Sequence, residues 1–186
     1  TELGKVYLYQ NAQIRQSLTS ITDAKAKAAA DKNATDALNN AIDALQKAIT
    51  LKGDYAPAHY NLGIAFDRKG KLKDAIKRLE AVVSYNQKDV GVGFQLALLY
   101  FRDGRKPAAI RLMESVVRLA PNFANARWYL GAMYEDAGDY TKALEQVNEV
   151  AKTNPDNSAV KQKLDDLSKK KPAAGLPTPI AAPVKP

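Results

Sequence analysis

The side chains that could perform acid–base or nucleophilic chemistry are few in this sequence, and their spacing does not bring them together. His59 is the only histidine and cysteine is absent, so neither a zinc site of the usual type nor a thiolate nucleophile can form. The clearest carboxylate pairs are Glu135 with Asp136 and Asp165 with Asp166. Adjacent positions on a helix do not face each other, so neither pair suits a general acid and base. We therefore predict a protein that is not an enzyme, with no catalytic residues, no metal site and no cofactor.

Two further features that often mark a functional site have a structural interpretation here. His59 falls where helices would pack, which favours a core histidine over a ligand or a general base. Gly91 and Gly93 open a helical pattern, but the lysine of a phosphate-binding loop and the spacing of a dinucleotide-binding fold are missing. No small-molecule substrate is therefore expected.

The net charge of +8 raises the question of a nucleic-acid partner. About half of the excess lies from Lys161 onward, where six lysines face two aspartates, and this is typical of a solvated end. No stripe of basic residues alternates with exposed aromatics, so we expect no nucleic acid. No apolar run approaches the roughly 20 residues that a bilayer span needs, so we expect no membrane-spanning segment.

The sequence carries little information about location. The lack of cysteine fits an extracytoplasmic or extracellular protein, while a cytoplasmic location stays open. The chain begins with Thr1 and shows no signal-peptide pattern, so we expect it to be processed or to be a piece of a longer protein.

The elements that would position any binding residues follow from an internal repeat of 34 residues. A shift of that length aligns a leucine, a small residue, an aromatic residue, a glycine and an alanine in each copy. The aligned sets are Leu62, Leu96 and Leu130; Gly63, Ala97 and Gly131; Phe66, Tyr100 and Tyr134; Gly70, Gly104 and Gly138; and Ala75, Ala109 and Ala143. The resulting copies are residues 56–89, 90–123 and 124–157.

Each copy contains two apolar patterns of helical period separated by a glycine turn. Glycine suits the left-handed turn between two helices, and the aligned alanines allow two backbones to approach closely. Pro107 falls at a helix start, and Pro121 and Pro155 fall just after helix ends. We predict an all-α fold with helices near residues 1–18, 23–52, 56–69, 73–86, 90–103, 107–119, 124–137, 141–153 and 157–170.

This pattern resembles the tetratricopeptide repeat (TPR) family over nearly all of residues 36–157. The sequence departs from the family pattern at two positions of the repeat. The position at which the family often has tryptophan holds His59, Gly93 or Arg127, and Gln87 replaces the proline that closes a repeat. The resemblance implies a right-handed α-solenoid of antiparallel helix pairs that binds proteins. It also suggests a likeness to TPR tails of bacterial envelope or surface proteins.

The repeat extends toward the N-terminus in a degenerate form, residues 1–55. Ala41 and Leu45 lie 34 residues before Ala75 and Leu79, and the pentad that begins at Leu3 resembles those of the first helices. The first copy contains 25 extra residues, which we interpret as an elongated hairpin with its turn near residues 17–23. The alternative is a break near residues 32–35 that would give a separate short helix.

The two ends of the array differ. Residues 158–171 read as a polar capping helix with Leu164 and Leu167 directed inward. Leu3, Val6 and Tyr7 have no comparable cover, so either a longer chain or another molecule is expected to cover them.

In the TPR family the first helices of successive repeats line a concave peptide-binding groove. The corresponding residues here are Tyr60, Asn61, Ile64, Arg68, Phe94, Gln95, Leu98, Phe101, Arg102, Asn125, Trp128, Tyr129 and Ala132. Amphipathic aromatic side chains favour an apolar or proline-containing partner. Tyr60 and Phe94 equally fit packing between helices, whereas Trp128 is expected to be exposed. Of the residues that clamp a chaperone's terminal carboxylates in one TPR subgroup, only Asn61 matches.

Residues 172–186 form a proline-rich tail with five prolines, expected to be extended. Two hypotheses remain. In the first, the chain binds copies of itself into a homo-oligomer or filament, through the capped C-terminal end or the tail, whose docking residues would be Leu176, Pro177, Pro179, Ile180, Pro183 and Val184. In the second, a monomeric scaffold recruits a foreign protein or peptide through the groove.

Overall fold

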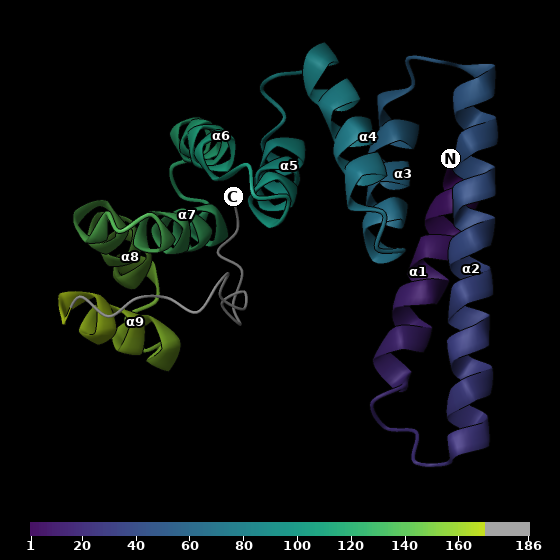
Figure 1. The fold of residues 1–186 in the computed structure, drawn as a ribbon, viewed down its shortest axis with the longest axis horizontal. Helices are drawn as coiled ribbons and strands as arrows, with labels where there is room; N and C mark the ends of the chain where they lie inside the picture. The colour runs from purple at the N-terminus through teal and green to yellow at the C-terminus, as the bar shows by residue number, and fades with distance from the viewer. Residues whose placement is uncertain (170–186) are drawn as a thin grey trace. The chain divides into compact units, whose positions relative to one another are not determined.

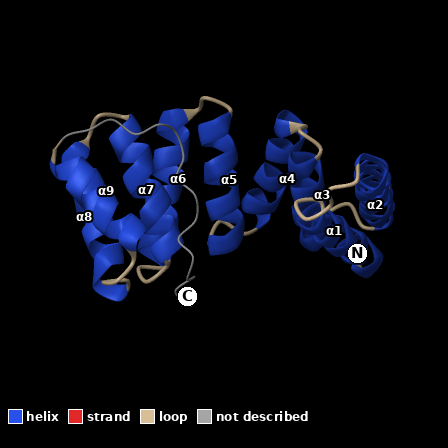
Figure 2. Cartoon of the chain, turned by 90° about the horizontal axis from the view of Figure 1, so that it is seen from below, coloured by secondary structure: helices blue, strands red, loops and turns tan. Residues whose placement is uncertain are grey.

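The structure is a computed structural model in which residues 1–169 are described. Those residues form nine α-helices joined by short connections, with no strand among them (Figures 1 and 2). The helices are α1 (Glu2–Ser17), α2 (Ala24–Leu51), α3 (Ala56–Arg68), α4 (Leu72–Tyr85), α5 (Val90–Arg102), α6 (Lys106–Leu119), α7 (Ala124–Asp136), α8 (Tyr140–Thr153) and α9 (Ser158–Ser168). Each observed end lies within two residues of its predicted end, so the predicted all-α fold is confirmed.

The helices form antiparallel pairs that group into two compact units. The N-terminal unit, Thr1–Gln87, contains the pairs α1–α2 and α3–α4, with α2 packed on α3. The C-terminal unit, Lys88–Pro186, contains the pairs α5–α6 and α7–α8, followed by α9 packed on α8. Each unit is therefore a stack of helix pairs with its own core.

Glycine closes the turn within each of the three regular pairs. Gly70, Gly104 and Gly138 have φ values of 75°, 80° and 80°, a conformation that costs glycine little because it lacks a Cβ atom. In the first of these turns the Lys71 N–H donates to the Phe66 carbonyl oxygen at 2.9 Å, which satisfies a carbonyl at the end of α3. The predicted left-handed turns are thus confirmed.

The close approach of paired helices depends on small residues. Ala75, Ala109 and Ala143 are each 0% exposed, as predicted from their register. A Cβ atom added at Gly63 would lie 2.8 Å from Leu79 Cδ2, so α3 and α4 are too close there for any larger residue without a shift.

The α1–α2 hairpin is elongated. α2 runs without interruption through 28 residues, so the alternative break near residues 32–35 is wrong. The Asp23 side chain accepts a hydrogen bond from the Ala26 N–H at 2.6 Å and caps the start of α2. Figure 1 shows that both helices of this hairpin extend well past the end of α3 within the same unit.

Candidate protein-binding surfaces

The predicted groove residues of the N-terminal unit lie on one side of α3. Tyr60, Asn61 and Ile64 are half-buried, whereas Arg68 in the last turn is exposed. Asn61 Nδ2 donates to the Pro57 carbonyl oxygen at 2.7 Å, so this side chain is turned toward its own helix. α3 therefore presents two half-buried apolar side chains followed by a cation.

Arg68 is joined to α1 by a residue that the sequence analysis did not single out. Its Nη1 donates to the Leu8 carbonyl oxygen at 2.7 Å and to Asn11 Oδ1 at 3.3 Å. Asn11 is 2% exposed, and its Nδ2 donates to the Ala34 carbonyl oxygen of α2 at 2.9 Å. One buried amide thus connects three helices. Asn11 could have been identified from the sequence, because it is the polar residue on the buried side of α1, in line with Gly4 and Leu8.

α1 carries an apolar surface made of three exposed side chains, Leu3, Val6 and Tyr9. Leu3 is 57% exposed, Val6 50% and Tyr9 66%. These are three of the six large apolar side chains that are exposed within residues 1–169, and they lie within seven positions of each other. Of the three residues predicted to lack cover, Leu3 and Val6 are exposed, whereas Tyr7 is half-buried.

A cleft between α1 and α2 borders this apolar side. Its volume is about 480 Å³. Its lining residues are Tyr7, Tyr9, Gln10, Gln13 and Ile14 from α1 and Asn33, Asp36, Ala37 and Asn40 from α2. Aromatic rings interspersed with amide groups form the type of surface on which proline-rich segments dock.

The predicted groove residues of the C-terminal unit lie on α5 and α7, and several of them pack against each other. The Phe94 ring lies 5.0 Å from that of Phe123 and 5.6 Å from that of Tyr129 between centroids. Of the two interpretations that were open for Phe94, the structure supports packing between helices. Gln95, Leu98 and Phe101 are half-buried, and Arg102 is exposed.

The expected exposure of Trp128 is wrong. Trp128 is 4% exposed, Tyr129 7% and Ala132 3%. The reason is the position of α7, which contacts α5, α6, α8 and α9, so that almost every one of its faces is covered. Burial also raises the pKa of Tyr129. Whether the candidate residues of α3, α5 and α7 line one groove stays a prediction.

Two of the residues at the expected tryptophan position make equivalent hydrogen bonds. His59 Nε2 lies 2.8 Å from the Gly53 carbonyl oxygen, and Arg127 Nε donates to the Pro121 carbonyl oxygen at 2.7 Å. The two acceptor residues, Gly53 and Pro121, lie two repeat lengths of 34 residues apart, so they occupy the same position in the repeat. Both side chains therefore anchor the connection that precedes their helix, which agrees with the structural role predicted for His59.

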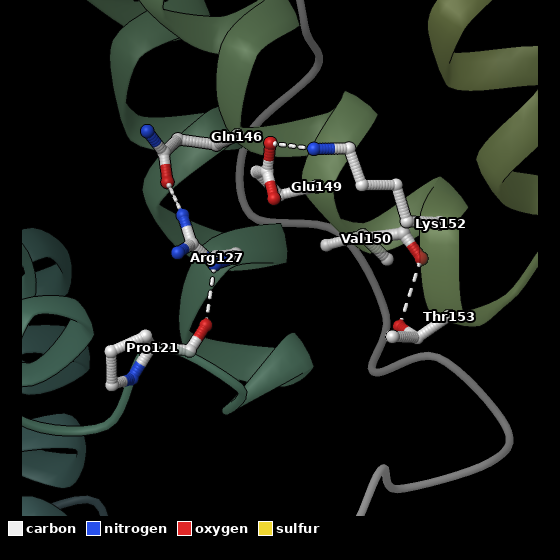
Figure 3. A network of polar contacts seen from close by, with 7 residues as sticks. All are labelled: Pro121, Arg127, Gln146, Glu149, Val150, Lys152 and Thr153. Carbon is white, nitrogen blue, oxygen red and sulfur yellow. Dashed lines mark hydrogen bonds and ion pairs between the residues drawn. The ribbon is translucent and has the colours of Figure 1, made fainter.

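Arg127 also belongs to a polar network on α8. Its Nη1 donates to Gln146 Oε1 at 2.9 Å, and nearby Lys152 Nζ lies 2.5 Å from Glu149 Oε1 (Figure 3). The hydrogen bond from Lys152 is the main cause that lowers the pKa of Glu149. The Arg127–Gln146 hydrogen bond joins α7 to α8.

The two adjacent carboxylates Glu135 and Asp136 form ion pairs with lysines of different helices. Glu135 lies 3.0 Å from Lys163 Nζ of α9, whereas Asp136 lies 2.8 Å from Lys106 Nζ of α6. Within residues 1–169, no group of three or more histidine, cysteine or acidic side chains is arranged to hold a metal ion. In the same range, the helices are all too short or too polar to cross a bilayer.

The predicted docking residues of the proline-rich tail, Leu176 to Val184, lie outside the described residues. The predicted cap precedes them: Leu167 of α9 is 1% exposed and Leu164 packs against the core. Asn157 caps the start of α9 by accepting hydrogen bonds from the Ala159 and Val160 N–H groups.

Comparison with protein families agrees with this architecture. Family models described as tetratricopeptide repeats match residues 56–89 and 94–158, and a model described as a TPR repeat matches residues 34–70. The chain belongs to the tetratricopeptide repeat family, whose members are typically non-catalytic scaffolds that bind proteins. The sequence has no significant match among the curated proteins.

Solved structures share the fold at low sequence identity. MamA protein superimposes with a TM-score of 0.68 and 20% identity, over 91% of this chain and 82% of that one. A tetratricopeptide repeat protein from Parabacteroides merdae gives 0.69 and 18%, over 87% and 60% of the two chains. YrrB, described as a TPR protein with an unusual peptide-binding site, gives 0.66 and 20%, over 73% and 70%.

Proposed function

We propose that this chain is a non-catalytic protein-binding module that associates with further copies of itself. The observation that carries the proposal is the uncovered apolar side of α1, with Leu3, Val6 and Tyr9 each at least half exposed. Large apolar side chains gathered on one exposed surface are typical of interaction sites.

The partner segment that we propose is the proline-rich tail of another copy, residues 172–186. The α1–α2 cleft offers Tyr7 and Tyr9 beside Gln10 and Gln13, and aromatic rings flanked by hydrogen-bonding groups suit a polyproline II segment. A segment already biased to that conformation loses less conformational freedom on binding. This complementarity supports the tail over the polar surface of α9 as the bound segment.

The proposed contact joins two different surfaces of the chain. A contact of this heterologous kind leaves one free surface at each end of the complex, so it propagates into a ring or an open filament. The lack of cysteine is compatible with such an assembly outside the cytoplasm, and we keep an extracytoplasmic location as part of the proposal.

Light scattering on the full chain over a range of concentrations tests the proposal. We expect the average particle mass to rise with concentration, and to stay at the monomer value after deletion of residues 172–186 or after Tyr9→Ser. Tyr85→Ser is the matched control, because Tyr85 is 63% exposed on α4, close to the 66% of Tyr9. A full chain that is monomeric at every concentration would refute self-association.

A foreign peptide is the second candidate partner. It is supported by the half-buried Tyr60 and Ile64 beside exposed Arg68 on α3, and by the shared fold of YrrB, a protein described as peptide-binding. A monomeric full chain in the light-scattering experiment would favour this candidate.

A further inference from the structure

A notch lies between α1 and the last turn of α3 in the N-terminal unit. Its volume is about 490 Å³, and its lining residues are Asn11, Ala12, Arg15 and Arg68. Two of the four lining side chains are cations and none is an acid. α1 continues past the end of α3 (Figure 1), and Arg15 in the last turn of α1 lines the notch, so this continuation forms one of its walls.

Arg68 is held in place by hydrogen bonds that use only one of its three guanidinium nitrogens. Both of its hydrogen bonds to α1, to the Leu8 carbonyl oxygen and to Asn11 Oδ1, use Nη1. Asn11 is itself buried and fixed to α2. The neighbouring Lys69 Nζ donates to Asn39 Oδ1 of α2 at 2.6 Å, so the end of α3 is tied on two sides. The guanidinium is therefore pre-positioned, and its hydrogen bonds within residues 1–169 leave Nε and Nη2 for a ligand.

Arg15 supplies the second cation from the elongated part of α1. Its nearest acid is Asp31, with 3.8 Å between Nη1 and Oδ1 and both side chains about half exposed. A separation of that length is beyond a normal hydrogen bond, and an exposed pair of this kind is weak. Arg15 is therefore able to take a ligand carboxylate without losing a strong partner.

We infer that this notch binds the carboxylate of an acidic segment in a protein partner. A guanidinium matches a carboxylate with two parallel N–H donors, and two arginines around one notch provide this twice. Ile64, one turn before Arg68 on α3, places an apolar side chain beside the charge, so the favoured segment carries an acidic residue next to an apolar one. The inference rests on the proposed protein-binding function, but not on self-association.

This site differs from the chaperone-carboxylate clamp of one TPR subgroup, of which only Asn61 is present. Arg15 belongs to the turns that α1 gains through its elongation, and such turns have no counterpart in a regular repeat. The elongated hairpin thus acquires a function, because it forms one wall of the notch.

Fluorescence anisotropy with two labelled synthetic peptides tests the inference on the full chain. One peptide carries two adjacent glutamates between leucines, and the other has glutamines in place of the glutamates. We expect the glutamate peptide to bind more tightly, and Arg15→Gln to weaken its binding by roughly fivefold, the size of effect of a partly exposed ion pair. Arg15→Lys should restore part of the loss, and binding should weaken as salt is added.

Lys47→Gln is the matched control, because it removes an exposed charge from α2 at the level of Leu45, far along the hairpin from Arg15. Arg68→Gln should weaken binding further, and its melting curve shows whether the α1–α3 contact survives. Equal binding of the two peptides, or equal loss in the Arg15 and Lys47 variants, would overturn the inference. Preferential binding of a phosphoserine peptide by more than tenfold would overturn it in favour of a phosphate site.

The same experiment separates this inference from self-association. A chain that stays monomeric in light scattering and still selects the glutamate peptide would reject the tail contact and keep the arginine site. A chain that assembles but does not distinguish the two peptides would support the tail contact and reject the arginine site.

Discussion

Gly4 and Leu45 meet across the α1–α2 hairpin at the register at which Gly63 and Leu79 meet across the α3–α4 pair. A Cβ atom added at Gly4 would lie 2.6 Å from Leu45 Cγ, and one added at Gly63 would lie 2.8 Å from Leu79 Cδ2. The two leucines are 34 positions apart, as in the regular repeat, while the glycines are 59 apart. The elongated hairpin therefore keeps the closing contact of a regular pair and takes up its 25 additional residues beyond that contact.

Replacing Gly4 should weaken this contact. We expect Gly4→Ala to lower the free energy of unfolding by about 1–3 kcal/mol, because the new methyl group forces Leu45 out of its position. Gly53→Ala is the control, since no atom lies within 4 Å of a Cβ atom placed there. Urea denaturation of both variants measures the difference, and equal stability of the two would contradict the packing described here.

Ala109 tests the equivalent close approach in the C-terminal unit. Ala109→Leu should destabilise by about 1–3 kcal/mol through overpacking, because residue 109 is 0% exposed. Ala29→Leu places the same side chain on an exposed face of α2 and should leave the melting temperature nearly unchanged. Thermal unfolding followed by circular dichroism compares the two, and an unaltered melting temperature for the Ala109 variant would show that the repeat register is misplaced.

Lys163 and Glu135 form the most buried ion pair of the C-terminal unit among the pairs described above. The Glu135 side chain is 1% exposed and lies 3.0 Å from Lys163 Nζ, so Lys163→Ala would leave a carboxylate buried without its cation. We expect a loss of about 3 kcal/mol in unfolding free energy. Lys152→Ala breaks the exposed pair with Glu149 and should have little effect. Similar losses of unfolding free energy in the two variants would show that burial does not determine how much these ion pairs stabilise the fold.

Tyr134 makes stability depend on pH on the alkaline side. Burial raises its pKa, and the hydrogen bond that its hydroxyl donates to Glu114 Oε1 at 2.5 Å raises it further. A pKa raised in the folded state contributes stability that is complete below the unfolded pKa of about 10 and is lost as the pH rises above it.

Tyr134→Phe should therefore cost about 1 kcal/mol near neutral pH through the lost hydrogen bond. The parent should therefore be more stable than this variant by an amount that shrinks above roughly pH 10. In that range Tyr134 of the parent loses its proton when the chain unfolds, which favours the unfolded state, whereas phenylalanine has no proton to lose. Tyr85→Phe, at an exposed position on α4, should show neither effect. A difference that grows with pH would contradict the assigned environment of Tyr134.

Most of the fold was predictable because the repeat imposes the same local chemistry three times. A glycine at 70, 104 and 138 and an alanine at 75, 109 and 143 fix the turn and the close approach in each pair. These are backbone requirements, so they can be read from residue type and spacing alone. The helix ends followed from the same register.

The binding surfaces were less predictable, because they depend on which helices cover which side chains. Trp128 stands at a groove position in the repeat, yet the neighbours of α7 bury it. The Arg15–Arg68 notch joins residues 53 positions apart, and Arg15 lies outside the repeat pattern altogether. Only the folded hairpin brings these two side chains to one site.

Mixing two variants that each lack one surface tests the proposed assembly most directly. One variant carries Val6→Ser with Tyr9→Ser and keeps its tail; the other lacks residues 172–186 and keeps its α1 surface. In sedimentation velocity we expect each variant alone to be a monomer and the mixture to contain a one-to-one dimer and nothing larger, because a single intact contact remains between them. A mixture that stays monomeric, or a variant that still forms oligomers by itself, would contradict head-to-tail association through the tail and the α1 surface.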